Sequence, residues 1–132
     1  MMSRYVDEEI NTEIKFQMET DKKNLIVELT FQFSLEIIEF SEFLESKRKY
    51  NMANQLFRSG IGIGANVREA QSAESKADFI HKMKIASKEA EETEYWLKLS
   101  KHSKSYPDCD NLLLQITSIL KVLRKIISSS RK

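Results

Sequence analysis

Residues 24–44, NLIVELTFQFSLEIIEFSEFL, decide whether this chain is all-α or contains a sheet. The odd positions from Leu25 to Ile37 are apolar, an alternation typical of a half-buried strand. With the apolar residues at 14, 16 and 18 and a loop at 20–24, the stretch could form a β-hairpin. The apolar run nevertheless continues to Leu44 without a turn residue, and more than about ten residues is long for a strand. We therefore predict a helix.

On a helix, the apolar side chains of this segment form two stripes. The first stripe contains Ile26, Phe33, Ile37, Phe40 and Leu44, and the second contains Val27, Phe31, Leu35 and Ile38. Thr30, Ser34 and Ser41 line one polar gap between them. Because a bundle helix needs only one apolar face, we expect the second stripe to contact the N-terminal arm or another subunit. Its four residues are our candidates for an oligomer interface.

Three further segments have apolar residues at helical spacing. The first seam contains Met52, Leu56, Ile63, Val67 and Ala70; the second contains Phe79, Met83, Ala86, Ala90 and Leu97; the third contains Leu113, Ile116, Leu120, Leu123 and Ile127. Ser75 with Asp78, and Asp110, are candidate N-cap signals. Four helices with short links predict an all-α, antiparallel up-down-up-down four-helix bundle over residues 22–132. Residues 1–21 are polar and acidic, and we treat them as an N-terminal arm.

All three glycines of the chain, Gly60, Gly62 and Gly64, lie inside the second predicted helix. Each costs about 1 kcal/mol relative to Ala in a helix. Gly60 and Gly64 are one turn apart, so we expect a neighbouring helix to approach closely there. A phosphate-binding loop is the alternative, but the dinucleotide fingerprint and the Walker lysine pattern are missing and no strand precedes the glycines.

Composition excludes several classes of protein. Three Gly and one Pro in 132 residues are too few turn signals for a sandwich or barrel. No stretch of about 18 uncharged apolar residues is present, and residues 1–9 lack the layout of a signal peptide, so we expect a cytoplasmic protein without membrane contact. The single Cys109 can form neither a disulfide within the chain nor a zinc site with a second thiol.

Charge is unevenly distributed along the chain. Residues 1–46 hold 4 Lys/Arg against 11 Asp/Glu, and residues 47–132 hold 17 against 9, although the net charge is only +1. The two halves could neutralise each other in a compact bundle, or an exposed basic face could attract phosphate groups. Our candidates for nucleic-acid contacts in the basic half are Arg48, Lys49, Lys98, Lys101, Lys121, Arg124 and Lys125.

No catalytic or metal-binding pattern is present. The two histidines, His81 and His102, lack the Glu-x-x-His spacing of di-iron bundles. The acidic residues between positions 89 and 94 are typical of a solvated helix face. Ser59 and Ser87 have no recognisable nucleophile motif. We therefore predict no enzymatic activity, metal, cofactor or small-molecule substrate.

The stretch Gln55–Ala70 (QLFRSGIGIGANVREA), followed by SKADF at 75–79, Ile85-Ala86 and ETEYWL at 92–97, resembles a four-helix-bundle family encoded by intervening sequences within bacterial 23S rRNA genes. The matching block runs from about Asn24 to the C-terminus. The resemblance implies a homo-oligomer, typically a five-fold ring, and extends to the accessory protein of diversity-generating retroelements, which binds a reverse transcriptase and nucleic acid.

The family pattern places polar residues at Arg58, Ser59, Asn66, Glu69, Asp78 and Glu94. They could be buried polar ties that set helix register, or a ligand surface. Gly62 stands where the family often has Ser, and the chain lacks the strong basicity of the retroelement accessory proteins. Our leading hypothesis is a non-enzymatic oligomeric adaptor that contacts RNA or a reverse-transcriptase-like enzyme. The alternatives are a structural or protein-interaction oligomer and, more distantly, a metal-dependent enzyme.

Overall fold

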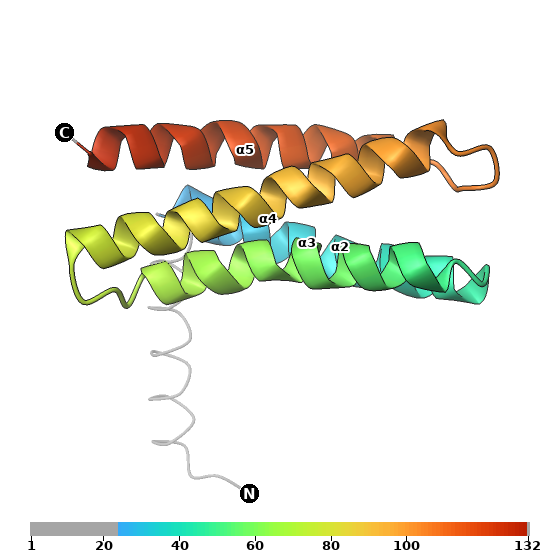
Figure 1. The fold of residues 1–132 in the computed structure, drawn as a ribbon, viewed down its shortest axis with the longest axis horizontal. Helices are drawn as coiled ribbons and strands as arrows, with labels where there is room; N and C mark the ends of the chain where they lie inside the picture. Colours follow the sequence, from blue (N-terminus) through green and yellow to red (C-terminus); the bar gives the residue numbers. More distant parts are fainter. Residues whose placement is uncertain (1–23, 132) are drawn as a thin grey trace, which may run out of the picture.

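The computed structural model describes residues 24–131, which form four α-helices (Figure 1). These are α2 (Leu25–Ser46), α3 (Tyr50–Ala70), α4 (Lys76–His102) and α5 (Asp110–Ser130). No strand occurs between residues 24 and 131. The all-α prediction is therefore confirmed, and residues 24–44 belong to a helix. The predicted arm at 1–21 lies outside the described residues.

The four helices pack around one apolar core. Helix α2 contacts α3 and α5, and α4 contacts the same two helices. The links α2–α3 and α4–α5 lie at one end of the molecule, and the link α3–α4 lies at the other (Figure 1). The largest fully buried side chains come from all four helices and include Phe33, Leu56, Met83 and Ile116. We call the end that carries the first two links the loop end.

Helix α2 buries residues at steps of three and four, including Thr30 and Ser41, which we had placed in a polar gap. The Thr30 hydroxyl donates a hydrogen bond to the Ile26 carbonyl at 2.8 Å. A helix satisfies a buried Thr in this way through its own i−4 carbonyl, so the residue can join the core without a partner from another helix. These two positions of the predicted polar gap therefore belong to the core.

The expected close approach at the glycines of α3 is confirmed. A Cβ atom added at Gly60 would lie 2.9 Å from two carbon atoms of the Ile37 side chain. At Gly64 it would lie 3.3 Å from the backbone carbonyl oxygen of Thr30. Helix α2 therefore packs so closely against α3 that a Cβ atom at Gly60 would clash, and one at Gly64 would require the neighbouring atoms of α2 to shift.

The helix starts were predicted with mixed success. Ser75 caps α4 as expected, because its hydroxyl accepts a 3.0 Å hydrogen bond from the Asp78 backbone amide. Asp110 is the first residue of α5 rather than its N-cap, which is Cys109 without a side-chain cap bond. The Asp108 carboxylate accepts from the Asp110 amide at 3.1 Å instead. The local turn at Asp108 thus satisfies a backbone donor at the start of the helix.

Candidate interaction surfaces

The link between α2 and α3 is a tight basic turn formed by Lys47, Arg48 and Lys49. The Lys49 amide donates to the Leu44 carbonyl at 2.8 Å, and the Arg48 amide donates to the Glu45 carbonyl at 2.9 Å. These bonds define a Schellman motif, whose left-handed residue is usually Gly. Here it is Arg48, with φ 63°. The motif holds three consecutive cationic residues at the loop end.

Aromatic rings surround this basic turn. The Lys49 ammonium donates to the Ser105 hydroxyl at 2.9 Å and lies 5.0 Å from the centre of the Tyr106 ring. The Lys47 ammonium lies 5.5 Å from the centre of the Phe43 ring. Tyr50, the first residue of α3, is exposed. Cations beside exposed aromatic rings can hold phosphates and stack bases of a single-stranded nucleic acid.

The seven predicted nucleic-acid residues fall into two groups rather than one patch. Arg48 and Lys49 lie in the basic turn, and Lys98 and Lys101 lie near the end of α4 that leads into the loop end. The second group is in the later half of α5 and contains Lys121, Arg124 and Lys125. The first group lies at or near the loop end and the second lies past the middle of α5, so the candidate cations are spread along the bundle.

Several of these cations are already engaged within the chain. Lys98 pairs with Glu94 at 3.6 Å, Lys101 with Asp110 at 3.1 Å, and Arg124 with Glu91 at 3.9 Å. Exposed pairs of this kind contribute little stability, on the order of 0–1 kcal/mol, but they reduce the positive potential of the surface. Within residues 24–131, Arg48, Lys121 and Lys125 have neither an ion-pair nor a hydrogen-bond partner for their side chains.

The predicted oligomer stripe on α2 is exposed at its centre. Phe31 is 53% exposed and Leu35 is 45% exposed, whereas Ile38 is partly buried. On α3, Phe57 is exposed, and Ile61, one turn further on, lines a shallow groove together with Phe31. We call Phe31, Leu35, Phe57 and Ile61 the α2–α3 apolar face. The rings of Phe31 and Phe57 each remain about half exposed in the single chain.

Val27, the remaining member of the predicted stripe, is only 3% exposed and belongs to the chain's own core. It lines the α2–α3 groove together with Gly64. Because α3 approaches α2 closely at Gly64, α3 covers more of the α2 surface there. Val27 is therefore buried, although it belongs to the same stripe as Phe31. Its assignment to an intersubunit contact is therefore corrected.

The six polar residues of the family pattern do not converge on one site. Ser59 alone is buried, at 1% exposure, and its hydroxyl accepts a 2.8 Å hydrogen bond from Thr93 of α4. Asn66 donates to the Gly62 carbonyl of its own helix at 2.8 Å. Arg58 and Glu69 are exposed, and Glu94 is partly buried beside Lys98. Ser59 and Thr93 thus join α3 to α4 through a buried hydrogen bond between their side chains.

Asp78 serves the start of α4. Its carboxylate accepts from the Glu74 amide at 3.2 Å and from Lys82 at 3.3 Å. The backbone hydrogen bond first, and then the hydrogen bond from Lys82, hold the pKa of Asp78 below its ordinary value. Both contacts favour the charged carboxylate, so Asp78 acts as a helix-start residue in this position.

Sequence reasoning missed two features of the α3–α4 contact. Thr93, buried against Ser59, sits between the conspicuous acidic residues of α4 and gave no signal of its own. Glu89 lies over Gly62, where an added Cβ would be 3.1 Å from its carboxylate oxygen. Burial first, and then the nearby charge of Glu92, raise the pKa of Glu89. The missing side chain at Gly62 leaves room for this carboxylate.

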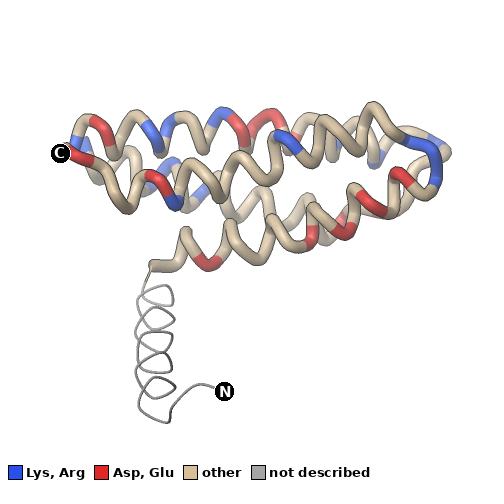
Figure 2. Tube along the Cα trace, turned by 90° about the horizontal axis from the view of Figure 1, so that it is seen from below, with Lys and Arg blue, Asp and Glu red and all other residues tan. Residues whose placement is uncertain are grey.

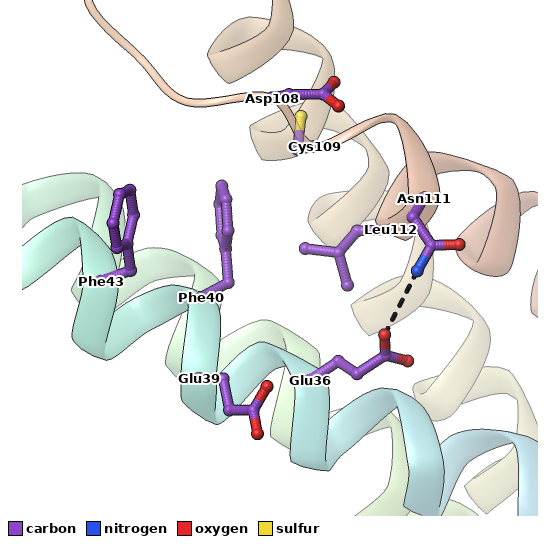
Figure 3. A pocket seen from close by; sticks show the side chains of 8 residues that line it. All are labelled: Glu36, Glu39, Phe40, Phe43, Asp108, Cys109, Asn111 and Leu112. Atoms are coloured by element: carbon purple, nitrogen blue, oxygen red, sulfur yellow. Dashed lines mark hydrogen bonds between the residues drawn. The ribbon is translucent and has the colours of Figure 1, made fainter.

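A second groove, also missed from the sequence, lies between the later half of α2 and the start of α5 (Figure 3). Its lining consists of Glu36, Glu39, Phe40, Phe43, Asp108, Cys109, Asn111 and Leu112. Asn111 donates to the Glu36 carboxylate at 3.3 Å and so joins the two helices. The available signal was the composition of α2, which contains five Glu and no Lys or Arg. Figure 2 shows this helix with acidic residues only, followed by the basic turn.

The thiol of Cys109 is buried beside this groove. It donates to the Leu97 carbonyl at 3.3 Å, and burial raises the pKa of Cys109. A protonated, buried thiol is a poor nucleophile. In the part of the chain that the structure describes, no group of three or more His, Cys, Asp or Glu residues could hold a metal ion. None of helices α2–α5 is both long and apolar enough to cross a membrane.

Comparisons with known proteins identify relatives over most of the chain. The model of a family described as 23S rRNA-intervening sequence protein matches residues 22–125. A solved structure from Bacteroides thetaiotaomicron, described as a protein with unknown function from the S23 ribosomal protein family, is 40% identical in sequence. It superimposes with a TM-score of 0.74, and the match covers 77% of this chain and 97% of that one. No curated protein matches the chain.

Proposed function

The chain belongs to the 23S rRNA-intervening sequence protein family, and on this premise we propose that it is a non-enzymatic, homo-oligomeric adaptor that contacts RNA or a nucleic-acid enzyme. The helices form an up-down-up-down antiparallel bundle in this proposal, a topology supported by links that alternate between the two ends (Figure 1). The adaptor acts in the cytoplasm and uses no cofactor or small-molecule substrate.

The observation that carries the assembly part of the proposal is the α2–α3 apolar face. Phe31 and Leu35 are about half exposed in the single chain, and Phe57 extends the surface onto α3. Covering apolar area releases roughly 25 cal/mol for each Å² removed from water, so half-exposed aromatic rings and a leucine on adjoining helices suit the centre of a subunit contact. We propose that this face forms the subunit contact of the five-fold ring that the family resemblance implies.

The basic turn supports the adaptor part of the proposal. Arg48 has no partner within the described residues, and Lys49 lies beside the Tyr106 ring. In a ring, several copies of this turn would lie on one side and present repeated cations to a phosphate backbone or to an acidic surface of a reverse-transcriptase-like enzyme. Repetition increases avidity without any new contact in the single chain.

A structural or protein-interaction oligomer without a nucleic-acid role is the second candidate. It is favoured by the engagement of Lys49, Lys98, Lys101 and Arg124 with groups of the same chain. The net charge of +1 is also low for a protein whose main ligand is a polyanion. This candidate keeps the assembly and drops the RNA contact.

Binding of a mixed single-stranded RNA pool over a salt series separates the two candidates. For the adaptor, the logarithm of the affinity should fall linearly with the logarithm of salt concentration. Arg48→Gln with Lys49→Gln should reduce the slope by about 0.7 for each lost phosphate contact. Lys84→Gln with Lys88→Gln, at exposed positions of α4 away from the loop end, removes the same number of charges and should leave the slope unchanged. A flat response of the unaltered protein would eliminate the RNA adaptor.

A further inference from the structure

We propose that the surface formed by α2 and α5 docks onto the same surface of a second copy of the chain, so that the acidic groove of each copy receives Lys121 and Lys125 of the other. We call this surface the α2–α5 face. It is distinct from the α2–α3 apolar face, and neither contact requires the other.

The acidic end of the α2–α5 face is suited to lysine side chains. Glu36, Glu39 and Asp108 supply carboxylates, and the rings of Phe40 and Phe43 stand side by side along the groove (Figure 3). Among residues 24–131, no Lys or Arg lines this groove. A lysine needs an apolar wall for its methylene chain and an anionic or aromatic site for its ammonium group. The ammonium of Lys47, 5.5 Å from the Phe43 ring centre, already uses this ring as a cation site.

The basic end of the face lies further along α5. Leu114, Lys121 and Lys125 are separated by seven and four residues, so they share one side of the helix. Leu114 is 70% exposed, the most exposed large apolar side chain in residues 24–131. Lys121 and Lys125 have no ion-pair partner there. One helix side therefore presents an uncovered leucine followed by two unpaired cations.

A shallow apolar depression separates the two ends. It is lined by Leu29 of α2 and by Leu114, Gln115, Ser118 and Ile119 of α5. Asn111 contacts Glu36, whereas Ile119 lies beside Leu29, so residue numbers rise along α5 as they fall along α2. Lys121 and Lys125 consequently lie beyond the depression. At 1.5 Å per residue they are about 15–21 Å from Asn111, which adjoins the acidic groove.

The order of acidic groove, apolar depression and lysines identifies a second copy as the occupant. Turning one copy by a half-turn about an axis through the depression places each groove opposite the lysines of the other copy. It also places Leu114 of both copies near the axis. An isologous contact has this self-complementary pattern. A basic protein segment would satisfy the groove but would leave the two lysines and Leu114 uncovered.

The proposal is tested in the Phe31→Lys/Leu35→Lys background, in which the α2–α3 contact is lost. Light scattering at low salt should then show a species of two chains, and adding Lys121→Glu/Lys125→Glu should reduce it to one. Adding Glu36→Lys/Glu39→Lys to those changes should restore two chains, because both ends of the face have exchanged sign. Circular dichroism verifies that each variant is folded.

Matched controls reverse the same number of charges outside the α2–α5 face. Lys84→Glu/Lys88→Glu on α4 and Glu42→Lys/Glu45→Lys on α2 change exposed residues that line neither the groove nor the depression, and should leave two chains. A single-chain species in the Phe31→Lys/Leu35→Lys background, or a two-chain species that survives Lys121→Glu/Lys125→Glu, would overturn the α2–α5 contact. If the Phe31→Lys/Leu35→Lys variant keeps the mass of the unaltered protein, the proposed α2–α3 contact is wrong instead. The Lys121→Glu/Lys125→Glu change is then tested in the unaltered chain.

Discussion

At the level of single residues, Arg48 shows a conflict between local backbone energy and surface chemistry. Its φ of 63° is strained for a residue with a Cβ, and a left-handed conformation costs roughly 1–2 kcal/mol. Gly would satisfy the Schellman motif at no steric cost. An arginine there places a guanidinium that has no partner within residues 24–131 beside Lys47 and Lys49 at the tip of the turn.

Arg48→Gly should therefore raise the free energy of unfolding by about 1 kcal/mol, because the strain at the left-handed position is relieved. The same change should weaken RNA binding, because a cation is lost. Arg48→Ala removes the charge but keeps the strain, so it should weaken binding equally without the gain in stability. Urea unfolding and RNA titration of both variants measure the two effects. Equal unfolding free energies for the Gly and Ala variants would contradict this account of the turn.

Residue-level expectations failed where packing depended on a neighbouring helix. Thr30 and Ser41 are polar and Val27 follows the stripe of Phe31, yet all three are buried. Periodicity within α2 cannot reveal how far α3 reaches around it. Conversely, Ser75 was identified correctly as an N-cap because its partner is three residues away and the interaction is local.

At the level of helices, the glycines of α3 have unequal roles. Gly60 and Gly64 face α2, where an added Cβ would meet the Ile37 side chain and the Thr30 carbonyl oxygen respectively. Gly62 faces α4, where the nearest atoms belong to the flexible Glu89 side chain. The sequence predicted close packing at the first two positions from their one-turn spacing, but it contained no information on the partner helix.

Ala substitutions should separate these roles. Gly62→Ala should be neutral or stabilising by up to about 1 kcal/mol, because it gains helix propensity and displaces only a flexible side chain. Gly60→Ala should be destabilising by about 1–2 kcal/mol, because overpacking against Ile37 exceeds the same gain. Thermal unfolding of the two variants makes the comparison. Similar melting temperatures would show that α2 does not approach α3 as closely as the structure indicates.

The helix prediction for residues 24–44 succeeded because the apolar run was too long for a strand. The apolar residues at odd positions do not indicate a pleated sheet. Some of them, such as Phe33, face the core of the bundle, whereas Phe31 and Leu35 are exposed on the helix surface. The predicted cap at Asp110 failed because the carboxylate of Asp108, two residues earlier, accepts the hydrogen bond from the Asp110 amide. Two acidic residues so close together cannot be distinguished by spacing alone.

At the level of the whole molecule, α2 carries only acidic charges and leads directly into the basic turn (Figure 2). The acidic α2 and the basic turn were both visible in the sequence. The sequence did not show that the seven candidate cations form two groups, because this separation depends on which ends of α4 and α5 lie together. The acidic groove was missed for the same reason, since its residues come from 36–43 and 108–112. A family resemblance predicted the fold, but surfaces between distant segments require the three-dimensional packing.

The most direct test of the central claim is the mass of the Phe31→Lys/Leu35→Lys variant measured by light scattering beside that of the unaltered chain. The account predicts that the unaltered chain forms an assembly of more than two copies. The variant, with charges in the middle of the α2–α3 apolar face, should contain no more than two. Leu99→Lys, at an exposed position of α4 outside both the α2–α3 apolar face and the α2–α5 face, is the control and should leave the mass unaltered. An unaltered mass in the Phe31→Lys/Leu35→Lys variant would contradict assembly through α2 and α3.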